Sequence, residues 1–165
     1  GGASTEIIVG KPLQPDCLNS LDMGCVVFQN CFFYQQKLSA QRFDSAIEQS
    51  RAQVRALRHQ YQKIGWQSVL GASGTFRALA EIAQAEQQAI LTRAWLASLI
   101  TRAINAGHVE KLDFLGLRED RRAILCGGLA ILMGILTELS VEQFDVTNGA
   151  LREGLLAEMV ATATA

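Results

Sequence analysis

The stretch WQSVLGASGTFRALAEIAQA, residues 66–85, joins a short apolar run, a glycine-bearing turn and a helical pattern. Residues 66–70 are expected to form a short buried strand, because the run is apolar and stops at a glycine. Residues 76–85 are expected to form a helix with Leu79 and Ile82 facing the core. A strand that passes through a glycine turn into a helix is typical of α/β proteins, so this stretch favours that class.

Working outward, the same alternation covers the rest of the chain. Extended segments are expected at 5–10, around 18–22 and at 143–147, and helices at 25–33, 39–63, 92–107, 127–139 and 150–159. Residues 112–122 are expected to form a loop with a short helix. This order predicts one α/β domain over residues 1–160, with a mostly parallel sheet and helices on both faces. A helical insert is expected at about 92–125 and a frayed tail at 161–165.

The composition excludes several classes of protein. Of 165 residues, 49% are hydrophobic and 19% are charged, which excludes a disordered tail or a fibrous repeat. The formal net charge is -1, so no global positive field draws nucleic acid or an anionic membrane. The longest uncharged apolar run, 123–137, is shorter than a bilayer-spanning helix. We therefore expect neither a nucleic-acid partner nor a membrane partner.

The cysteines and histidines do not suggest a metal site. Cysteines stand at positions 17, 25, 31 and 126 without a C-x-x-C pair, and His59 and His108 lie at no metal-ligand spacing from them. We interpret the cysteines as small buried apolar residues of a reduced, cytoplasmic protein. The two histidines are expected to be structural or solvated.

Three glycine-bearing turns lie beside expected strand ends, where α/β sheets bind their ligands. They are residues 1–5, 71–75 and 148–149. Small residues let backbone N–H groups approach phosphate oxygens, and two of these turns lead into helix N-termini. The alternative is that the glycines serve tight packing only. None of the turns carries the Lys-Ser/Thr of a Walker motif.

Charged residues suggest two further hypotheses. Glu6 follows the first turn directly, where a carboxylate can hold Mg²⁺ or orient an attacking water; otherwise it is a solvent-facing residue of an edge strand. Arg51, Arg55 and Arg58 form a row on the polar face of the longest helix. That row is either a solvated face or a surface for a polyanion or another domain.

Five blocks in one order resemble the exopolyphosphatase/guanosine pentaphosphate phosphohydrolase (Ppx/GppA) family. They are Gly1-Gly2-Ala3-Ser4-Thr5-Glu6, Ser20-Leu21-Asp22-Met23-Gly24-Cys25-Val26, Gly71-Ala72-Ser73-Gly74-Thr75, Gly127-Gly128-Leu129-Ala130-Ile131-Leu132 and residues 145–154. The family belongs to the actin/sugar-kinase/heat-shock ATPase superfamily. The resemblance implies the second of its two ribonuclease-H-like domains.

The resemblance also implies an activity and a site. It implies hydrolysis of phosphoanhydrides, with polyphosphate or guanosine pentaphosphate as substrate and Mg²⁺ as cofactor. Glu6 would be catalytic and would place the metal or the water. The residues implied to grip phosphate are Gly1, Gly2, Ser4, Thr5, Gly71, Ser73, Gly74, Thr75 and Gly149.

The family pattern includes segments that this sequence does not show. An aspartate and its strand, the middle one of the sheet, normally precede the first glycine block, and a whole first domain precedes that. We therefore expect the first domain of the same enzyme as a partner, a homodimer formed through open strand edges, and an inactive isolated chain. Two alternatives stay open: a non-catalytic phosphate-binding, nucleotide-binding or dimerisation module, and a phosphotransferase of the same superfamily, which would need an acceptor pocket and an adenine site.

Overall fold

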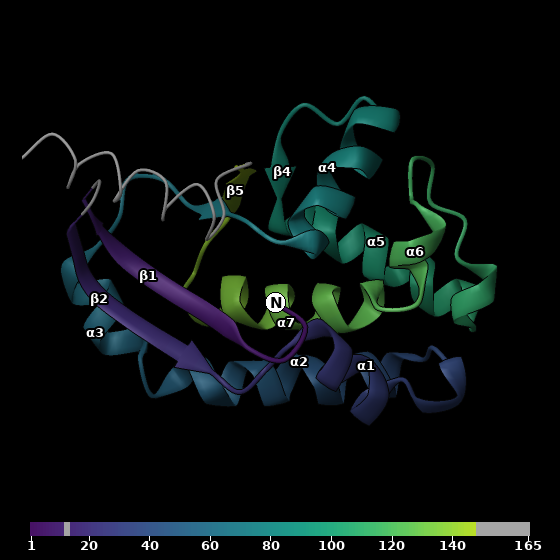
Figure 1. Cartoon of the computed structure of the whole chain (residues 1–165), viewed down its shortest axis with the longest axis horizontal. Coiled ribbons are helices and arrows are strands. Elements are labelled where there is room, and N and C mark those ends of the chain that lie inside the picture. Colours follow the sequence, from purple (N-terminus) through teal and green to yellow (C-terminus); the bar gives the residue numbers. More distant parts are fainter. Residues whose placement is uncertain (12–13, 148–165) are drawn as a thin grey trace, which may run out of the picture.

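The computed structural model describes residues 1–11 and 14–147 as an α/β arrangement (Figure 1). Its helices are α1 Cys25–Phe32, α2 Ala40–Arg55, α3 Arg58–Ile64, α4 Gly74–Ala85, α5 Arg93–Ala106, α6 Glu119–Arg122 and α7 Leu125–Glu138. Short 3₁₀ turns span Tyr34–Gln36 and Val109–Lys111. The strands are β1 Thr5–Lys11, β2 Gln14–Leu21, β3 Leu70–Gly71, β4 Leu91–Thr92 and β5 Gln143–Val146. The helix expected at 150–159 and the tail at 161–165 lie outside the described residues.

Helix α7 is the centre of the hydrophobic core. Its sequence is apolar on every side, and residues from Leu125 to Gly134 are buried without interruption. A helix of this kind needs cover all round. Figure 1 shows it crossing the middle of the molecule, with α2 on one side and α4 and α5 on the other. The structure thus builds its layers around this helix.

The strands form two separate sheets, which corrects the expectation of a mostly parallel sheet. β1 and β2 pair as an antiparallel hairpin, while β5 pairs in parallel with β3 and antiparallel with β4. The link between β1 and β2 spans only residues 12–13. A parallel crossover needs about a dozen residues or more. A link this short therefore permits only antiparallel pairing.

Two expected elements differ in extent. The helix expected over 39–63 breaks after Arg55, and Leu57 donates to the Val54 carbonyl in a tighter turn before α3 begins. The break lets Tyr61 on α3 donate from its hydroxyl to the Ile7 carbonyl of β1, at 2.7 Å. The strand expected over 66–70 is only two residues long, and Leu70 is 62% exposed.

Local signals at the helix ends are confirmed. Ser39 accepts a hydrogen bond from the Arg42 amide at the start of α2, and Thr92 accepts one from the Trp95 amide at the start of α5. Both are N-caps, which satisfy an amide that the helix cannot. Gly65, with a φ of 74°, ends α3 as expected. On α4, Leu79 and Ile82 are fully buried.

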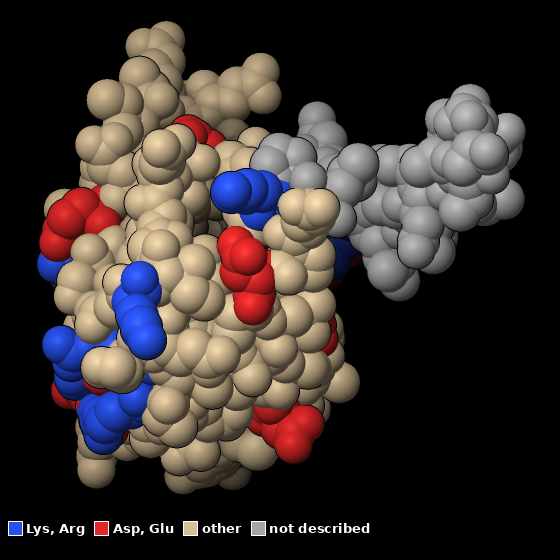
Figure 2. Space-filling view, turned by 90° about the vertical axis from the view of Figure 1, so that its left-hand side faces the viewer, with Lys and Arg blue, Asp and Glu red and all other residues tan. Residues whose placement is uncertain are grey.

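The charged surface agrees with the near-neutral composition. Figure 2 shows a face on which Lys and Arg side chains are interspersed with Asp and Glu, without a continuous patch of one sign. Among residues 1–11 and 14–147, no helix has the length and apolarity needed to cross a bilayer.

Candidate functional site

A groove of about 850 Å³ lies between the β1–β2 hairpin and the β3–β5 sheet. One wall is formed by the consecutive residues Thr5 to Val9, and the opposite wall by the run from Ser68 to Phe76. Since side chains alternate between the two faces of a strand, a wall of consecutive residues means that the groove follows the strand edge. Within the described strands, β1 pairs only with β2 and β3 only with β5, so both edges facing the groove are open.

The first glycine loop is held against the start of α1. The Gly1 carbonyl accepts from the Cys25 amide at 3.0 Å, and the Gly2 carbonyl accepts from the Val26 amide at 3.1 Å. This close approach needs a glycine at position 24, where a Cβ atom would collide with the Gly2 carbonyl. The loop carbonyls are therefore used inside the fold. The amides of residues 2–4 donate to none of the described residues and are available to an anion.

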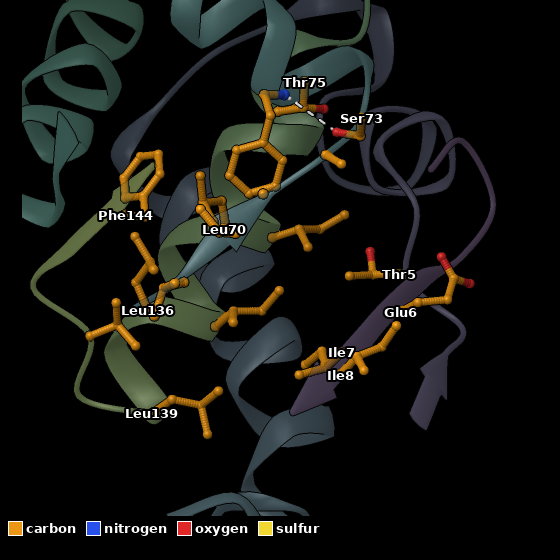
Figure 3. Close-up of a pocket in the computed structure, with 18 of the residues that line it drawn as sticks. Thr5, Glu6, Ile7, Ile8, Leu70, Ser73, Thr75, Leu136, Leu139 and Phe144 are labelled. Atoms are coloured by element: carbon orange, nitrogen blue, oxygen red, sulfur yellow. Dashed lines mark hydrogen bonds between the residues drawn. The ribbon is translucent and has the colours of Figure 1, made fainter. Parts of the chain in front are cut away.

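The second glycine loop leads into α4 at the other wall. The Ser73 hydroxyl accepts from the Phe76 amide at 3.3 Å, shown as a dashed line in Figure 3. This N-cap leaves the amides of Gly74 and Thr75, the first two of α4, without an acceptor among the described residues. Free amides at a helix N-terminus attract negative charge. The loop therefore presents donors at the mouth of the groove.

Glu6 is the single charged side chain among the described residues that line the groove. Its Oε1 accepts from the Ser4 hydroxyl at 2.7 Å and from the Ser20 hydroxyl at 3.0 Å. The hydrogen bond from Ser4 is the main reason why the pKa of Glu6 is lowered from its ordinary value, and Ser20 lowers it further. The side chain is thus an ionised carboxylate near neutral pH. Its Oε2 accepts no hydrogen bond from the described residues.

Glu6 also fits a magnesium ion. Mg²⁺ is usually held by one or two carboxylates together with substrate phosphates and water, rather than by a cage of protein ligands. Among the described residues, no three His, Cys, Asp or Glu side chains gather into such a cage. One ionised carboxylate beside two anion-binding loops matches the first arrangement.

The deep part of the groove has a different character. Helix α7 forms its floor with Ile131, Leu132, Ile135 and Leu136, and Leu139 follows directly after the helix. Figure 3 shows Leu136, Leu139 and Phe144 well away from Thr5 and Glu6. A phosphate loses its hydration in such surroundings without compensation. Only the polar mouth, where the two loops lie, suits an anion.

The structure brings most of the predicted site residues to one groove. Gly1, Thr5, Glu6, Gly71, Ser73, Gly74 and Thr75 line it, and Gly2 and Ser4 lie in the same first loop. The Thr5 hydroxyl donates to the Met23 carbonyl at 2.5 Å, so its proton holds the loop in place. Gly149 lies outside the described residues. Next to the second loop, the guanidinium of Arg121 lies where a Cβ atom on Gly74 would be.

Other candidate residues have structural roles. Arg51, Arg55 and Arg58 surround the carboxylate of Glu138, which is 4% exposed, so their row is an ion-pair network. His108 accepts from the Glu110 amide at 3.4 Å and caps a 3₁₀ turn. All four cysteines are free, and three are buried as expected; Cys31 is exposed.

Comparison with known proteins assigns this arrangement to a family. The sequence model of the Ppx/GppA phosphatase family matches residues 1–163. The chain belongs to the Ppx/GppA phosphatase family. A relative in Vibrio campbellii, named guanosine-5'-triphosphate,3'-diphosphate pyrophosphatase, is 41% identical over 97% of the chain. A relative of the same name in Vibrio cholerae is 40% identical. The chain spans about a third of their length, 32% in each case.

Solved structures of the Ppx/GppA family confirm the ribonuclease-H-like fold. The PPX-GPPA enzyme of Aquifex aeolicus superposes on 96% of the chain with a TM-score of 0.79 and 21% identity, and the match covers 54% of that protein. An exopolyphosphatase from Cytophaga hutchinsonii superposes on 98% of the chain with a TM-score of 0.79 and 19% identity, covering 55% of that protein. At these identities the likeness concerns the fold.

Proposed function

We propose that this chain forms one phosphate-binding wall of a phosphoanhydride hydrolase. The observation that carries the proposal is the meeting of two loops with free amides and one ionised carboxylate at the mouth of a single groove. The loops, residues 1–5 and 71–75, bind phosphate oxygens, and Glu6 acts on the water or the metal. The curated relatives named as pyrophosphatases support the reaction class.

Catalysis of this reaction depends mainly on positioning the phosphate and the attacking water, with little covalent chemistry by the protein. Water attacks the terminal phosphorus, the P–O bond to the bridging oxygen breaks, and that oxygen leaves with the rest of the chain of phosphates. Backbone amides of the two loops stabilise the charge that builds up on the phosphoryl oxygens. Glu6 orients the attacking water or accepts a proton from it, and its lowered pKa keeps the carboxylate ionised for either role.

Magnesium is proposed as the cofactor, with Glu6 as its ligand from this chain. When bound, the ion neutralises phosphate charge at the reacting end of the substrate. Glu6 contributes the oxygen that Ser4 and Ser20 leave free, and these two hydroxyls fix the orientation of the carboxylate.

Guanosine pentaphosphate is the proposed substrate, with inorganic polyphosphate as the second candidate. The name of the Vibrio relatives, guanosine-5'-triphosphate,3'-diphosphate pyrophosphatase, favours the nucleotide. The groove itself offers only phosphate-binding groups at its mouth, and both substrates end in the same phosphoanhydride. The residues that select between them are therefore expected on the first domain, the proposed partner, which closes over this wall.

A chimera tests the proposal. This chain replaces the corresponding third of the Vibrio campbellii pyrophosphatase, and phosphate release from guanosine pentaphosphate and from polyphosphate is measured with and without Mg²⁺. We expect Mg²⁺-dependent release by the chimera and none above blank by the isolated chain, because one wall cannot position the nucleophile. A folded chimera that binds the nucleotide without releasing phosphate would instead indicate a non-catalytic module.

The homodimer and the cytoplasmic location are also proposals. The dimer is supported by the two open strand edges that flank the groove. The location is supported by four free cysteines, three of them buried, which is typical of a reducing compartment.

A further inference from the structure

Two adjacent glycines near the start of α7, Gly127 and Gly128, contact two different helices. A Cβ atom on Gly127 would collide with the Cys25 carbonyl of α1 and would lie 2.8 Å from the Gln29 nitrogen. A Cβ atom on Gly128 would lie 2.5 Å from Oγ1 and 2.6 Å from Cγ2 of Thr75, on α4. Successive residues of a helix point about 100° apart, so this glycine pair brings both helices close to α7. Figure 1 shows α1 and α4 on opposite sides of α7.

Both contacts lead directly to the two glycine loops. The Cys25 amide donates to the Gly1 carbonyl at 3.0 Å, so the position of α1 fixes the first loop. Thr75 is the second residue of α4 and the last residue of the second loop, 71–75. Four of these residues line the groove mouth together: Gly1, Cys25, Thr75 and Gly128. The width of the mouth therefore depends on how closely α1 and α4 approach α7.

A buried hydrogen bond holds α1 at this distance. The Gln29 side chain is 6% exposed, and its Oε1 accepts from the Gly127 amide at 3.0 Å. Gly127 is the third residue of α7, and the first amides of a helix have no acceptor within it. Gln29 thus caps α7 from a neighbouring helix, at the same point where the missing side chain of Gly127 permits the close contact.

We propose that Gly127 and Gly128 set the spacing between the two phosphate loops and are positioning residues for the reaction. The inference rests on the proposed function and deepens it, because one phosphate chain has to reach the amides of both loops at once. A displacement of about an ångström can cost an enzyme a large part of its rate. A side chain at position 128 would widen the mouth, and Gln29 keeps the α1 side from moving away.

Gly128→Ala is the first test. Rotation of Thr75 cannot make room, because Oγ1 and Cγ2 both lie within 2.6 Å of the added methyl group, and every other staggered rotamer leaves one of these two positions occupied. The backbone of α4 or α7 must therefore shift. Calorimetry measures binding of inorganic triphosphate to the whole chain, and NMR measures amide shifts at residues 2–4 and 71–75. We expect wild type to show shifts in both loops, and Gly128→Ala to bind about tenfold or more weakly, with shifts in one loop only.

A rescue variant and a control separate spacing from stability. Serine has one γ atom, which can rotate away from the methyl group, so Gly128→Ala/Thr75→Ser should recover most of the binding of Thr75→Ser alone. Gly134→Ala is the matched control. Gly134 is also on α7, a Cβ atom there would lie 2.5 Å from Cβ and Oγ of Ser50 on α2, and it lies outside the groove lining. We expect a lower melting temperature and triphosphate binding within about twofold of wild type.

Gln29→Met decides the matter if Gly128→Ala fails to fold. It removes the acceptor for the Gly127 amide without adding bulk at the glycine pair, so we expect weaker binding and smaller shifts at residues 2–4 than at 71–75. Wild-type binding by Gly128→Ala with shifts in both loops would refute the spacing role and leave the proposed site standing. If wild type shows no shifts in either loop, the proposed site fails and the spacing role fails with it. Equal loss of binding in Gly134→Ala, or no recovery in the double variant, would trace the loss to general stability and would also refute the spacing role.

Discussion

At the scale of single residues, two serine hydroxyls set the state of Glu6. Ser4 lies just before β1 and Ser20 lies on β2, and both donate to Oε1. One oxygen of the carboxylate is thereby fixed by two hydroxyl donors. The hairpin therefore orients this charge as well as carrying it.

Glu6→Gln in the chimera removes the charge and keeps the shape of the side chain. We expect turnover to fall by about 10² to 10⁴-fold, the usual contribution of a positioned acid–base group. Substrate affinity should fall less, since backbone amides bind the phosphate. The melting temperature should hardly change, because an exposed carboxylate supports little packing. Steady-state phosphate release measures turnover and affinity, and thermal unfolding measures the melting temperature. Turnover within about twofold of wild type would exclude Glu6 from the site.

Ser4→Ala should shift the acid side of the pH–rate profile. The Ser4 hydrogen bond stabilises the ionised form of Glu6 and lowers its pKa, so losing this bond raises the pKa. As the pH is lowered, activity that depends on the carboxylate should then be lost at a higher pH than in wild type. Ser20→Ala is the control, with a smaller shift expected, because Ser20 lowers the pKa less. An unchanged acid limb in Ser4→Ala would contradict this reading of Glu6.

At the scale of elements, the contact between α2 and α7 organises the core. Ser50 on α2 is fully buried and donates to the Ile131 carbonyl of α7 at 2.9 Å. The next residue, Arg51, donates from Nε to Glu138 at 3.1 Å. Arg55 and Arg58 lie 3.6 Å from the same carboxylate. A buried negative charge at the end of α7 is thus neutralised by a row of arginines that begins on α2.

Glu138→Gln should weaken this contact. The buried side chain loses its charge, while the arginines, which are partly exposed, remain solvated. We therefore expect a loss of about 1–3 kcal/mol in the free energy of unfolding, less than for a fully buried pair. Glu48→Gln is the matched control, because Glu48 pairs with Arg51 and Arg55 but is exposed. Its loss should be much smaller, because an exposed ion pair contributes little to stability. Urea unfolding measures both, and equal losses would contradict a special role for Glu138.

The sequence predicted where helices and strands lie better than it predicted which elements they contact. Caps and apolar spacing located α1, α4, α5 and α7, because those signals are local. The break between α2 and α3 was not visible, since the apolar stripe from Val54 to Tyr61 continues through it and only the contact of Tyr61 with β1 explains the turn. Likewise, the arginine row looked solvated because its partner, Glu138, lies far away in the sequence. The two glycine-bearing loops at the groove could be located from their glycines, while their binding of phosphate stays a prediction.

At the scale of the whole molecule, two sheets face each other across a groove with open edges. The hairpin also carries an exposed apolar pair, Ile8 at 57% and Leu18 at 56%, which lie opposite each other in the β1–β2 register. Open edges next to exposed apolar side chains favour pairing with another chain.

We therefore expect the isolated chain to self-associate. Light scattering should give a mass that rises with concentration toward that of a dimer. Ile8→Lys places a charge beside the open edge and should shift the chain toward the monomer. The control is Leu115→Lys, because Leu115 is similarly exposed, at 63%, and lies outside the groove lining. A single monomeric mass for wild type over a wide concentration range would rule this out.

The open edge of β1 has a consequence for the exchange of backbone hydrogens with solvent. In a strand with one neighbour, only every second amide donates a hydrogen bond to that neighbour. Strand β5, which lies between β3 and β4, has neighbours on both sides. In deuterated water, amides of β1 should therefore separate into slow and fast sets that alternate along the strand. A molecule or second chain that binds along this open edge would slow exchange in the fast set alone. The same measurement would therefore show which residues of the edge are covered.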